Sequence, residues 1–344
     1  MKVCLLGPVT TKSYYGGVAV FDEELAKGFV DCGWEAVFAT TQKDAEEKDI
    51  PLRIVSKTNF EEFLEREKPD FVISSLAYAK VLPKNNHVKT AYFLHGFFLQ
   101  SYYGALKSVL ATSYQKMLIK KCDLVFANSY FTRMANKEFF KIKTDAVFHL
   151  GVSQKFLRAS DKIQGIERLQ NSIFFAGRLV SVKGVDVIVK AAHYLKQKNI
   201  PYTMYLAGDG PDKEKISKYI AANQLNVTLL GRLNYEQMCE WYHKTEVFVS
   251  LNPSEPFGIV FPEALVSGCK IVCPLTGGQV EYLKDYSDTV SFVNEANPES
   301  VAEGIETMFE HGIPARNIDE CKRRFNYKRV ATEIIEYIGE NKNE

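Results

Sequence analysis

The sequence predicts an α/β protein made of two similar domains, each a doubly wound parallel sheet, that face each other across a cleft. Three observations carry this prediction. The 344 residues exceed the ~250–300 at which one hydrophobic core usually divides. Short apolar runs alternate with segments of helical period in both halves. Glycines and charged residues follow several of these runs, at the carboxyl ends of strands where such sheets bind ligands.

The first predicted domain covers residues 1–155. Val18 to Cys32 has the period of an amphipathic helix. The polar stretch Ser153–Asn171 has the composition of an interdomain linker. The expected strands are Val3–Leu6, Ala36–Ala39, Phe71–Ser75, Thr90–Leu94 and Leu124–Ala127.

The second predicted domain covers residues 165–324, where the alternation is clearer. Asn234 with Gln237 forms a plausible capping box, and Gly268 lies where a helix is expected to stop. The clearest helical face comprises Val185, Ile188, Val189, Ala192 and Leu195. The expected strands are Ser172–Ala176, Thr203–Ala207, Val227–Leu230, Val247–Leu251 and Lys270–Cys273.

The composition is that of an ordinary globular protein, with 46% hydrophobic and 25% charged residues. The net charge of +1 argues against a general nucleic-acid binder, so no nucleic-acid partner is expected. The seven cysteines form no CxxC pair, which indicates buried or free thiols in a reducing compartment. The N-terminal apolar run is too short for a signal peptide, and no run approaches the ~20 apolar residues of a membrane span. A cytoplasmic protein is therefore expected.

The window from Glu255 to Glu263 is the most informative motif. It places two carboxylates eight residues apart, just after a strand. Pro256 assigns Glu255 to the strand-to-helix loop, whereas Pro262 is compatible with the first turn of the next helix. Carboxylates accept hydrogen bonds from sugar hydroxyls, and amides at a helix start bind anions. The window therefore suits a polyhydroxylated ligand that carries phosphate.

Two cations in the same domain complement this window. Arg178 follows a predicted strand, and Lys183 precedes a helix that is expected to begin near Gly184. Two cations and a helix dipole that converge on one spot favour a diphosphate site. Solvated surface cations are the alternative for this pair taken alone.

Two glycine pairs and one histidine complete the candidate residues. Gly16 and Gly17 precede the first long helix, and Gly277 and Gly278 follow a later strand; both pairs suit an approach to phosphate or sugar, or plain turns. His95 directly follows a strand, where either a ligand contact or a structural role is open. No GxGxxG motif occurs, so a nicotinamide or flavin cofactor is poorly supported.

No metal site is expected. The histidines show no paired ligand spacing, and the chain has no Asp-x-Asp pair of the kind that holds a divalent metal on a diphosphate. Arg178 and Lys183 could take the place of that metal. We therefore predict a metal-independent site without a cofactor.

The region of residues 97–143 is basic and aromatic. Residues 80–145 contain eleven basic and three acidic residues, and Phe97 to Cys122 mixes lysines with Phe98, Tyr102, Tyr103 and Leu106. An amphipathic helix of this kind favours an anionic membrane surface. A helix packed on the sheet with a lysine-rich solvent face is the alternative.

Taken together, these residues resemble the retaining glycosyltransferases of family 4, which have the two-domain GT-B fold. The resemblance extends over nearly the whole chain, and the Glu-x7-Glu window with Arg178 and Lys183 is its most specific part. Its other elements are Gly16-Gly17, His95-Gly96, Ala127-Asn128-Ser129, His149-Leu150-Gly151-Val152, Ala207-Gly208-Asp209-Gly210-Pro211 and Gly277-Gly278 with Glu281.

The resemblance implies a role for each candidate. Arg178 and Lys183 would neutralise the leaving diphosphate, Glu255 would bind the donor sugar, and His95 would contact the sugar and help to position the acceptor. The residues implied to bind the donor are Gly16, Gly17, Phe257, Gly258, Ile259, Glu263, Gly277 and Gly278. The C-terminal segment from about residue 325 to 344 would cross back onto the first domain, which would bind the acceptor.

The implied function is metal-independent transfer of a sugar from a nucleotide-diphosphate sugar to a glycan or glycolipid, with retention of configuration. Surface polysaccharide or lipopolysaccharide synthesis at the inner membrane face is the expected setting. The alternatives are a sugar phosphorylase or epimerase on the same scaffold, and a sugar-nucleotide-binding module without activity. The presence of all four residues Arg178, Lys183, Glu255 and Glu263 argues against the last.

Overall fold

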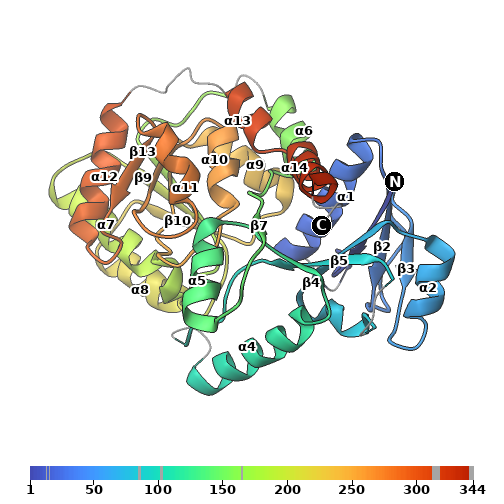
Figure 1. Cartoon of the computed structure of the whole chain (residues 1–344). Helices are drawn as coiled ribbons and strands as arrows, with labels where there is room; N and C mark the ends of the chain where they lie inside the picture. Colours follow the sequence, from blue (N-terminus) through green and yellow to red (C-terminus); the bar gives the residue numbers. More distant parts are fainter. Residues whose placement is uncertain are drawn as a thin grey trace. The chain divides into compact units, whose positions relative to one another are not determined.

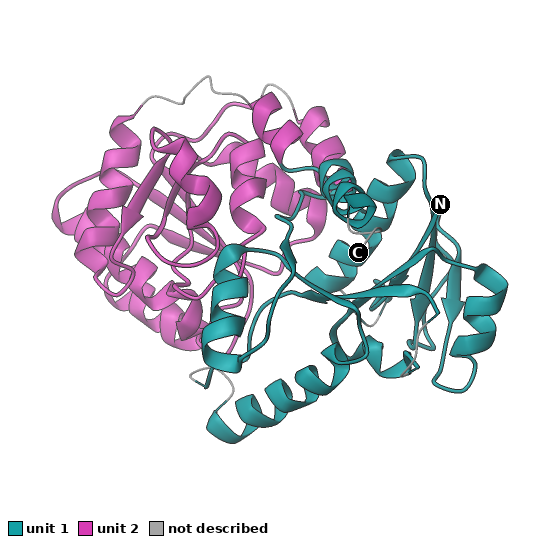
Figure 2. Ribbon diagram, viewed as in Figure 1, with its two compact units in different colours: residues 1–153, 325–344 teal, residues 154–324 magenta. Residues whose placement is uncertain are grey.

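The computed structural model describes residues 1–12, 14, 16–83, 87–100, 104–163, 166–311 and 318–340. It divides the chain into two compact units: residues 1–153 with 325–344, and residues 154–324 (Figure 2). Each unit contains one parallel sheet flanked by helices (Figure 1). The predicted fold class is confirmed in both units.

The first unit contains a seven-stranded sheet in the order β3-β2-β1-β4-β5-β6-β7. The strand order reverses beside β1, which pairs with β2 on one side and β4 on the other. All five predicted strands are present, and the short edge strands β3 and β7 were not predicted. The strands are β1 (Lys2–Leu6), β2 (Glu35–Thr40), β3 (Leu52–Ile54), β4 (Phe71–Ser75), β5 (Lys89–Leu94), β6 (Leu124–Ala127) and β7 (Ala146–Val147).

The C-terminal helix α14 belongs to this first unit and packs on α1 (Figure 1). A Cβ at Gly28 would lie 2.2 Å from the Tyr327 carbonyl oxygen, so glycine permits the close approach. Val330 and Ile334 of α14 are fully buried in the core of the unit. The helices of this unit among the described residues are α1 (Gly17–Asp31), α2 (Phe60–Glu67), η1 (Leu76–Val81), α4 (Ala105–Ile119), α5 (Tyr130–Phe140) and α14 (Tyr327–Glu340).

The second unit contains a six-stranded sheet in the order β10-β9-β8-β11-β12-β13. Its order reverses between β8 and β11, which brings the loops after these two strands together. The five predicted strands are present, and β13 was not predicted. The strands are β8 (Ser172–Ala176), β9 (Thr203–Ala207), β10 (Val227–Gly231), β11 (Val247–Val249), β12 (Lys270–Pro274) and β13 (Val290–Val293).

The predicted linker Ser153–Asn171 is wrong. Gln154–Lys162 forms helix α6 and belongs to the second unit, which begins at residue 154. Phe156 is fully buried against the rings of Tyr235 and Tyr242, so one apolar side chain anchors an otherwise polar helix. The polar composition of residues 154–162 therefore reflects the exposed face of a helix and does not indicate a linker.

Two helices of the second unit begin and end, respectively, where the sequence predicted a helix start and a helix stop. Asn234 and Gln237 form the capping box through two hydrogen bonds of 2.9 Å, and Gly268, after α10, has a φ of +75°. The helices are η2 (Ser181–Lys183), α7 (Val185–Gln197), α8 (Lys213–Ala222), α9 (Tyr235–Lys244), α10 (Val260–Val266), α11 (Val280–Leu283), η3 (Lys284–Tyr286), α12 (Pro298–Glu310) and α13 (Ile318–Arg324).

The cysteines and the described helices add two further facts. All seven cysteines are free, and five of them are buried. Within the described part of the chain, no helix has the length and apolar character needed to cross a membrane.

Candidate active site

The predicted cation pair and the glutamate window lie at the carboxyl ends of the adjacent strands β8 and β11. Gly184 allows the two loops to meet: its φ is +68°, and a Cβ there would lie 2.5 Å from Cβ of Leu251. The loop that carries Lys183 can therefore reach the loop that carries Glu255. The spacing of residues in the sequence could not predict this contact, because the contact depends on the order of the strands in the sheet.

Lys183 and Glu255 form a direct ion pair, with Nζ 2.6 Å from Oε2. The side-chain amide of Asn252 donates to the same carboxylate oxygen over 2.7 Å. Arg178 lies two residues after β8 with an exposed side chain that makes no ion pair or hydrogen bond with the described residues. The structure thus holds Glu255 in place on two sides and leaves the Arg178 guanidinium open to an anion.

The start of α10 is fixed by a residue that the sequence did not single out. Tyr282 Oη donates to the carbonyl oxygens of Phe257 and Gly258 over 2.9 and 3.1 Å. The amide of Gly278 donates to the Glu255 carbonyl over 2.8 Å, which ties the second glycine pair to the glutamate loop. The amides of Gly258 and Ile259 make no hydrogen bond within the described residues.

Gly258 adopts a backbone conformation that a side chain would not tolerate. Its φ is +81°, and a Cβ would lie 2.7 Å from Phe261 and 2.9 Å from Cγ of Glu255. Gly277 also has a positive φ, of +97°. Glycine adopts these positive φ values without steric cost.

Glu263 lies in the first turn of α10, as predicted, and is partly buried. The hydroxyl of Tyr242 donates to its Oε2 over a long 3.4 Å. Burial raises the pKa of the Glu263 carboxyl to about 8. Burial thus favours the protonated form of this carboxyl.

The predicted residues of the first unit lie at the start of α1 and after β5. Gly16 is the N-cap of α1 and Gly17 is its first residue; their amides donate to no described group. A Cβ at Gly17 would meet nothing within 4 Å, whereas a Cβ at Gly16 would lie 2.6 Å from the hydroxyl oxygen of Tyr14. His95 is partly exposed, and its Nε2 lies 3.0 Å from Oγ of Ser75. Sequence reasoning did not identify Ser75.

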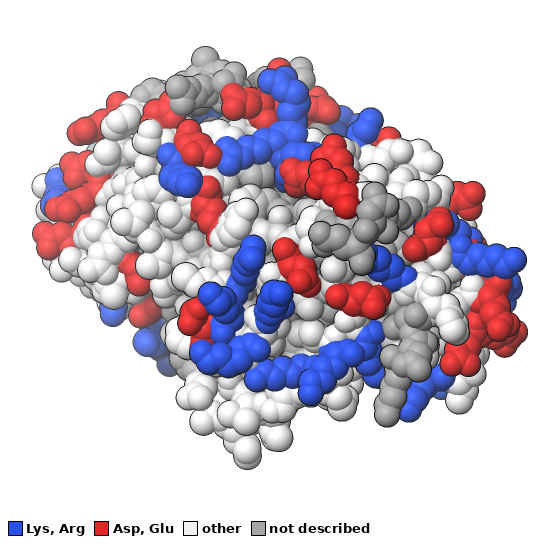
Figure 3. Space-filling model, in the orientation of Figure 1, with Lys and Arg blue, Asp and Glu red and all other residues white. Residues whose placement is uncertain are grey.

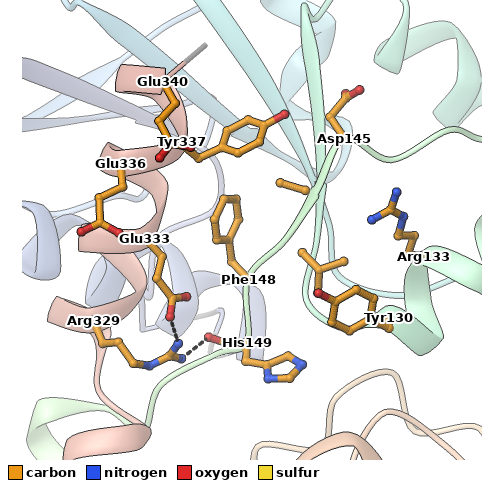
Figure 4. Close-up of a pocket in the computed structure, with 12 residues that line it drawn as sticks. Tyr130, Arg133, Asp145, Phe148, His149, Arg329, Glu333, Glu336, Tyr337 and Glu340 are labelled. Atoms are coloured by element: carbon orange, nitrogen blue, oxygen red, sulfur yellow. Dashed lines mark hydrogen bonds and ion pairs between the residues drawn. The ribbon is translucent and has the colours of Figure 1, made fainter.

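A separate cavity of about 530 Å³ in the first unit lies between α5, β7 and α14 (Figure 4). Its walls combine Arg133 and Arg329 with Asp145 and several glutamates of α14. Arg329 is held by Glu333 and by the carbonyl of His149, over 2.8 Å for the latter. None of the residues predicted for the donor or for catalysis lines this cavity.

The described residues contain no cluster of three or more His, Cys, Asp or Glu side chains that could hold a metal ion. The groups around Glu255 are instead a lysine, an amide and backbone N–H donors. This set suits an oxygen-rich anion and its hydroxyl groups.

Residues 158–325 match the family model of the glycosyl transferases group 1. The uncharacterized glycosyltransferase MJ1178 of Methanocaldococcus jannaschii is 22% identical over 95% of this chain and 94% of its own length. MJ1607 of the same organism is 26% identical over 50% of this chain and 45% of its own length.

Three solved structures share the fold over nearly the whole chain. Sucrose-phosphate synthase from Thermosynechococcus elongatus has a TM-score of 0.78 at 16% identity and covers 98% of each chain. Anabaena HepE in complex with UDP and glucose has a TM-score of 0.71 at 17% identity, covering 99% of this chain and 100% of its own. WaaG, a glycosyltransferase involved in lipopolysaccharide biosynthesis, has a TM-score of 0.64 at 14% identity, covering 97% and 94%.

The two parallel-sheet units and these matches define the protein as a glycosyltransferase of the GT-B class. Over residues 158–325, almost all of them in the second unit, the similarity is to the group 1 glycosyl transferases.

Proposed function

We propose that the protein transfers a sugar from a nucleotide-diphosphate sugar to a glycan or glycolipid, with retention and without a metal, in the synthesis of a surface polysaccharide or lipopolysaccharide. The observation that carries the proposal is the ion pair of Lys183 and Glu255 at the reversal point of the second sheet, with Arg178 in the same loop as Lys183. HepE, which shares the fold, binds UDP and glucose, and WaaG acts in lipopolysaccharide biosynthesis.

In this proposal the second unit binds the donor. Arg178 and Lys183 bind the diphosphate and stabilise the charge that develops as it leaves. Lys183 then exchanges part of its contact with Glu255 for phosphate oxygen. Glu255 accepts hydrogen bonds from the sugar, the amides of Gly258 and Ile259 donate to sugar or phosphate, and Glu263 accepts from the ribose hydroxyls.

The acceptor is assigned to the first unit, and His95 contacts the sugar. The bond from the anomeric carbon to the diphosphate oxygen breaks, and the bond to the acceptor oxygen forms on the same face. The acceptor proton passes to the departing phosphate. Glu255 acts by position and charge and forms no covalent bond.

Transfer is expected to be insensitive to EDTA, because the two cations supply the charge that a divalent metal supplies elsewhere. Nucleotide release would be measured with candidate donors and acceptors, with and without EDTA. A strict metal requirement would contradict the cation-pair mechanism. Release of a sugar phosphate that depends on orthophosphate would replace transfer with phosphorolysis.

Donor affinity is expected to increase with pH up to about 8, the pKa of Glu263. Hydrogen bonds from ribose hydroxyls favour the ionised carboxylate, so binding releases a proton below that pH. The largest effect that a single titrating group can have is roughly a tenfold change in the Kd of the donor per pH unit. Calorimetry with a nucleotide sugar would measure this dependence. The Glu263→Gln variant should bind the nucleotide sugar more weakly, and its affinity should not depend on pH in this range. If the variant kept the pH profile of the wild type, Glu263 would be excluded as the source of the pH dependence.

A membrane surface is the partner proposed for α4. The helix begins at Ala105, after Gly104 with a φ of +76°, so Phe97 and Phe98 precede it, and Tyr102 and Tyr103 lie outside the described residues. Its buried positions are Ser108, Thr112 and Leu118. Five apolar side chains of the helix are between 42% and 73% exposed: Leu106, Val109, Leu110, Tyr114 and Met117. A surface helix usually turns its apolar residues toward the core.

Lysines accompany the apolar face of α4. Lys107 and Lys120 are exposed on or next to the helix, and Lys137, Lys141 and Lys143 are exposed on and after α5. Figure 3 shows a band of Lys and Arg side chains along the region of α4 and α5, next to uncharged surface at the bottom of the view. Apolar side chains beside cations match the interface of an anionic bilayer, which supports a peripheral position on the inner membrane face.

The protein is expected to sediment with vesicles that contain anionic lipid at low salt, and less so at high salt. Leu106→Glu with Leu110→Glu should abolish this binding without loss of fold, because both side chains are exposed. Ile54→Glu, at an exposed apolar residue outside α4, is the matched control. Equal sedimentation of the double variant and the wild type would exclude α4 as the membrane contact.

A further inference from the structure

The cavity of about 530 Å³ in the first unit lies at the edge of the sheet, beside the last strand β7 (Figure 4). Among the described strands, β7 pairs with β6 alone, and the residues from Asp145 to His149 line the cavity along this edge. Helix α5 supplies Tyr130 and Arg133 on one side, and α14 faces them on the other. The volume is within the range of about 300–1,000 Å³ that is usual for small-molecule sites.

Helix α14 turns a polar stripe toward this cavity. Val330, Ile334 and Ile338 form a different stripe of the same helix and are buried in the core of the unit. The two stripes follow the period of an α-helix, so one helix completes the core and also supplies hydrogen-bonding groups to the cavity. The residues of α14 that line the cavity are Arg329, Glu333, Glu336, Tyr337 and Glu340.

The walls contain both a donor and an acceptor that other described residues do not satisfy. Arg133 and Glu336 make no ion pair or hydrogen bond with a described residue. Arg329, by contrast, is held by Glu333 and by the His149 carbonyl. A guanidinium only donates hydrogen bonds and a carboxylate only accepts them. One ligand can satisfy both groups if it carries hydroxyls, because a hydroxyl donates and accepts.

The charge of the cavity disfavours an anionic ligand. The rings of Phe148 and Tyr337, with centroids 6.0 Å apart, add flat apolar surface beside the polar groups. Two guanidiniums against four carboxylates give the walls a formal net charge of −2, which repels phosphate: Arg133, Arg329, Asp145, Glu333, Glu336 and Glu340.

One end of the cavity lies at the same edge of the sheet as His95. Tyr130 and His149 follow β6 and β7, and Figure 4 shows them together at that end. His95 follows β5, and the side-chain amide of Asn128 donates to its carbonyl over 3.1 Å. Neighbouring strands are roughly 4.8 Å apart, so β7 lies roughly 10 Å from β5. A chain of sugars can span this distance, whereas a single sugar at His95 would not enter the cavity.

We propose that this cavity binds a neutral saccharide unit of the acceptor glycan, remote from the sugar that is extended. The inference rests on the proposed function, in which the first unit binds the acceptor and His95 contacts the sugar. It narrows the acceptor to an uncharged glycan chain that reaches from His95 to the cavity. It also assigns contacts with that chain to α5 and α14.

Saturation-transfer difference NMR of the full chain without a donor tests the cavity, with linear neutral oligosaccharides of glucose, galactose, mannose and N-acetylglucosamine. At least one of them should bind, whereas oligogalacturonate, which has a carboxylate on each sugar, should not. Arg133→Ala with Glu336→Gln leaves the net charge unchanged. This double variant should raise Kd by roughly a hundredfold, about tenfold for each lost hydrogen bond.

Glu61→Gln with Arg66→Ala, at exposed positions of α2, is the matched control and should bind as the wild type does. Equal affinity of the Arg133→Ala/Glu336→Gln variant and the wild type would overturn the proposal, and so would binding of none of the neutral oligosaccharides. Preference for an arginine-rich peptide, which the negative walls would also attract, would likewise overturn it.

Kinetics separate this inference from the proposed function. With an oligosaccharide acceptor, the Arg133→Ala/Glu336→Gln variant should have a raised KM for the acceptor, while kcat and the KM for the nucleotide sugar stay unchanged. With a monosaccharide acceptor, variant and wild type should react equally. Equal KM values for the oligosaccharide would refute the link to the acceptor. If no nucleotide sugar is a donor, the proposed function fails, and the NMR titration still decides whether the cavity binds a saccharide.

Discussion

Arg178→Ala and Lys183→Ala are each expected to lower the rate of sugar transfer by roughly 10²-fold or more, the scale for the loss of one group that stabilises developing charge. Arg178 has an exposed guanidinium without a partner in the described part of the chain, so the substitution should leave the fold intact. Lys183→Ala also removes the cation that lies 2.6 Å from Glu255. Its effect should therefore be the larger of the two.

Steady-state kinetics on the purified variants measure these effects. Lys215→Ala, at an exposed position of α8, is the matched control for the loss of one positive charge in the same unit. Lys183→Arg retains the charge and should recover part of the rate. Wild-type rates in Arg178→Ala and Lys183→Ala would refute the assignment of the diphosphate to these residues.

Glu255→Gln is expected to lower kcat by about 10²-fold while the affinity for the nucleotide diphosphate without its sugar changes little. The substitution retains the size of the side chain and removes the charge that the Lys183 ammonium and the Asn252 amide hold in place. A group that acts on the sugar in the transition state affects turnover more than nucleotide binding. Asn252→Ala should have a smaller effect, about tenfold, because it removes one neutral donor.

The split between kcat and Kd in Glu255→Gln distinguishes an enzyme from a binding module. Rapid-mixing assays give turnover, and titration with the nucleotide diphosphate gives Kd. A change confined to Kd, with turnover intact, would favour a role for Glu255 in binding alone.

The sequence predicted the central strands of both sheets because each is an apolar run followed by a turn. It missed β3, whose three residues include only one that is buried, and it missed α6, whose one fully buried apolar side chain is Phe156. Short edge strands and polar helices depend on neighbours that are distant in sequence. Periodicity over a few residues cannot report those neighbours.

Some features of the candidate site could be predicted from the sequence and others could not. The residue types of Arg178, Lys183 and Glu255 and their places after strands were predictable, because parallel strands bring such positions to one edge. The hydrogen bond from Tyr282 to the Phe257 carbonyl and the hydrogen bond from Ser75 to Asp22 were not predictable from the sequence. The burial of Asp22 could not be predicted, because an acidic residue in an amphipathic helix is usually exposed. Its burial depends on where α1 lies against the ends of β1 and β4.

The most direct test of the central claim is a thermal-shift panel of UDP, GDP, ADP and dTDP and their sugars. It would be run with and without EDTA, on the wild type and on the Arg178→Ala/Lys183→Ala double variant. A ligand that binds only the folded state raises Tm by mass action. One nucleotide class is expected to stabilise the wild type equally with and without EDTA and not to stabilise the double variant. Stabilisation by none of them, or equal stabilisation of both proteins, would contradict it.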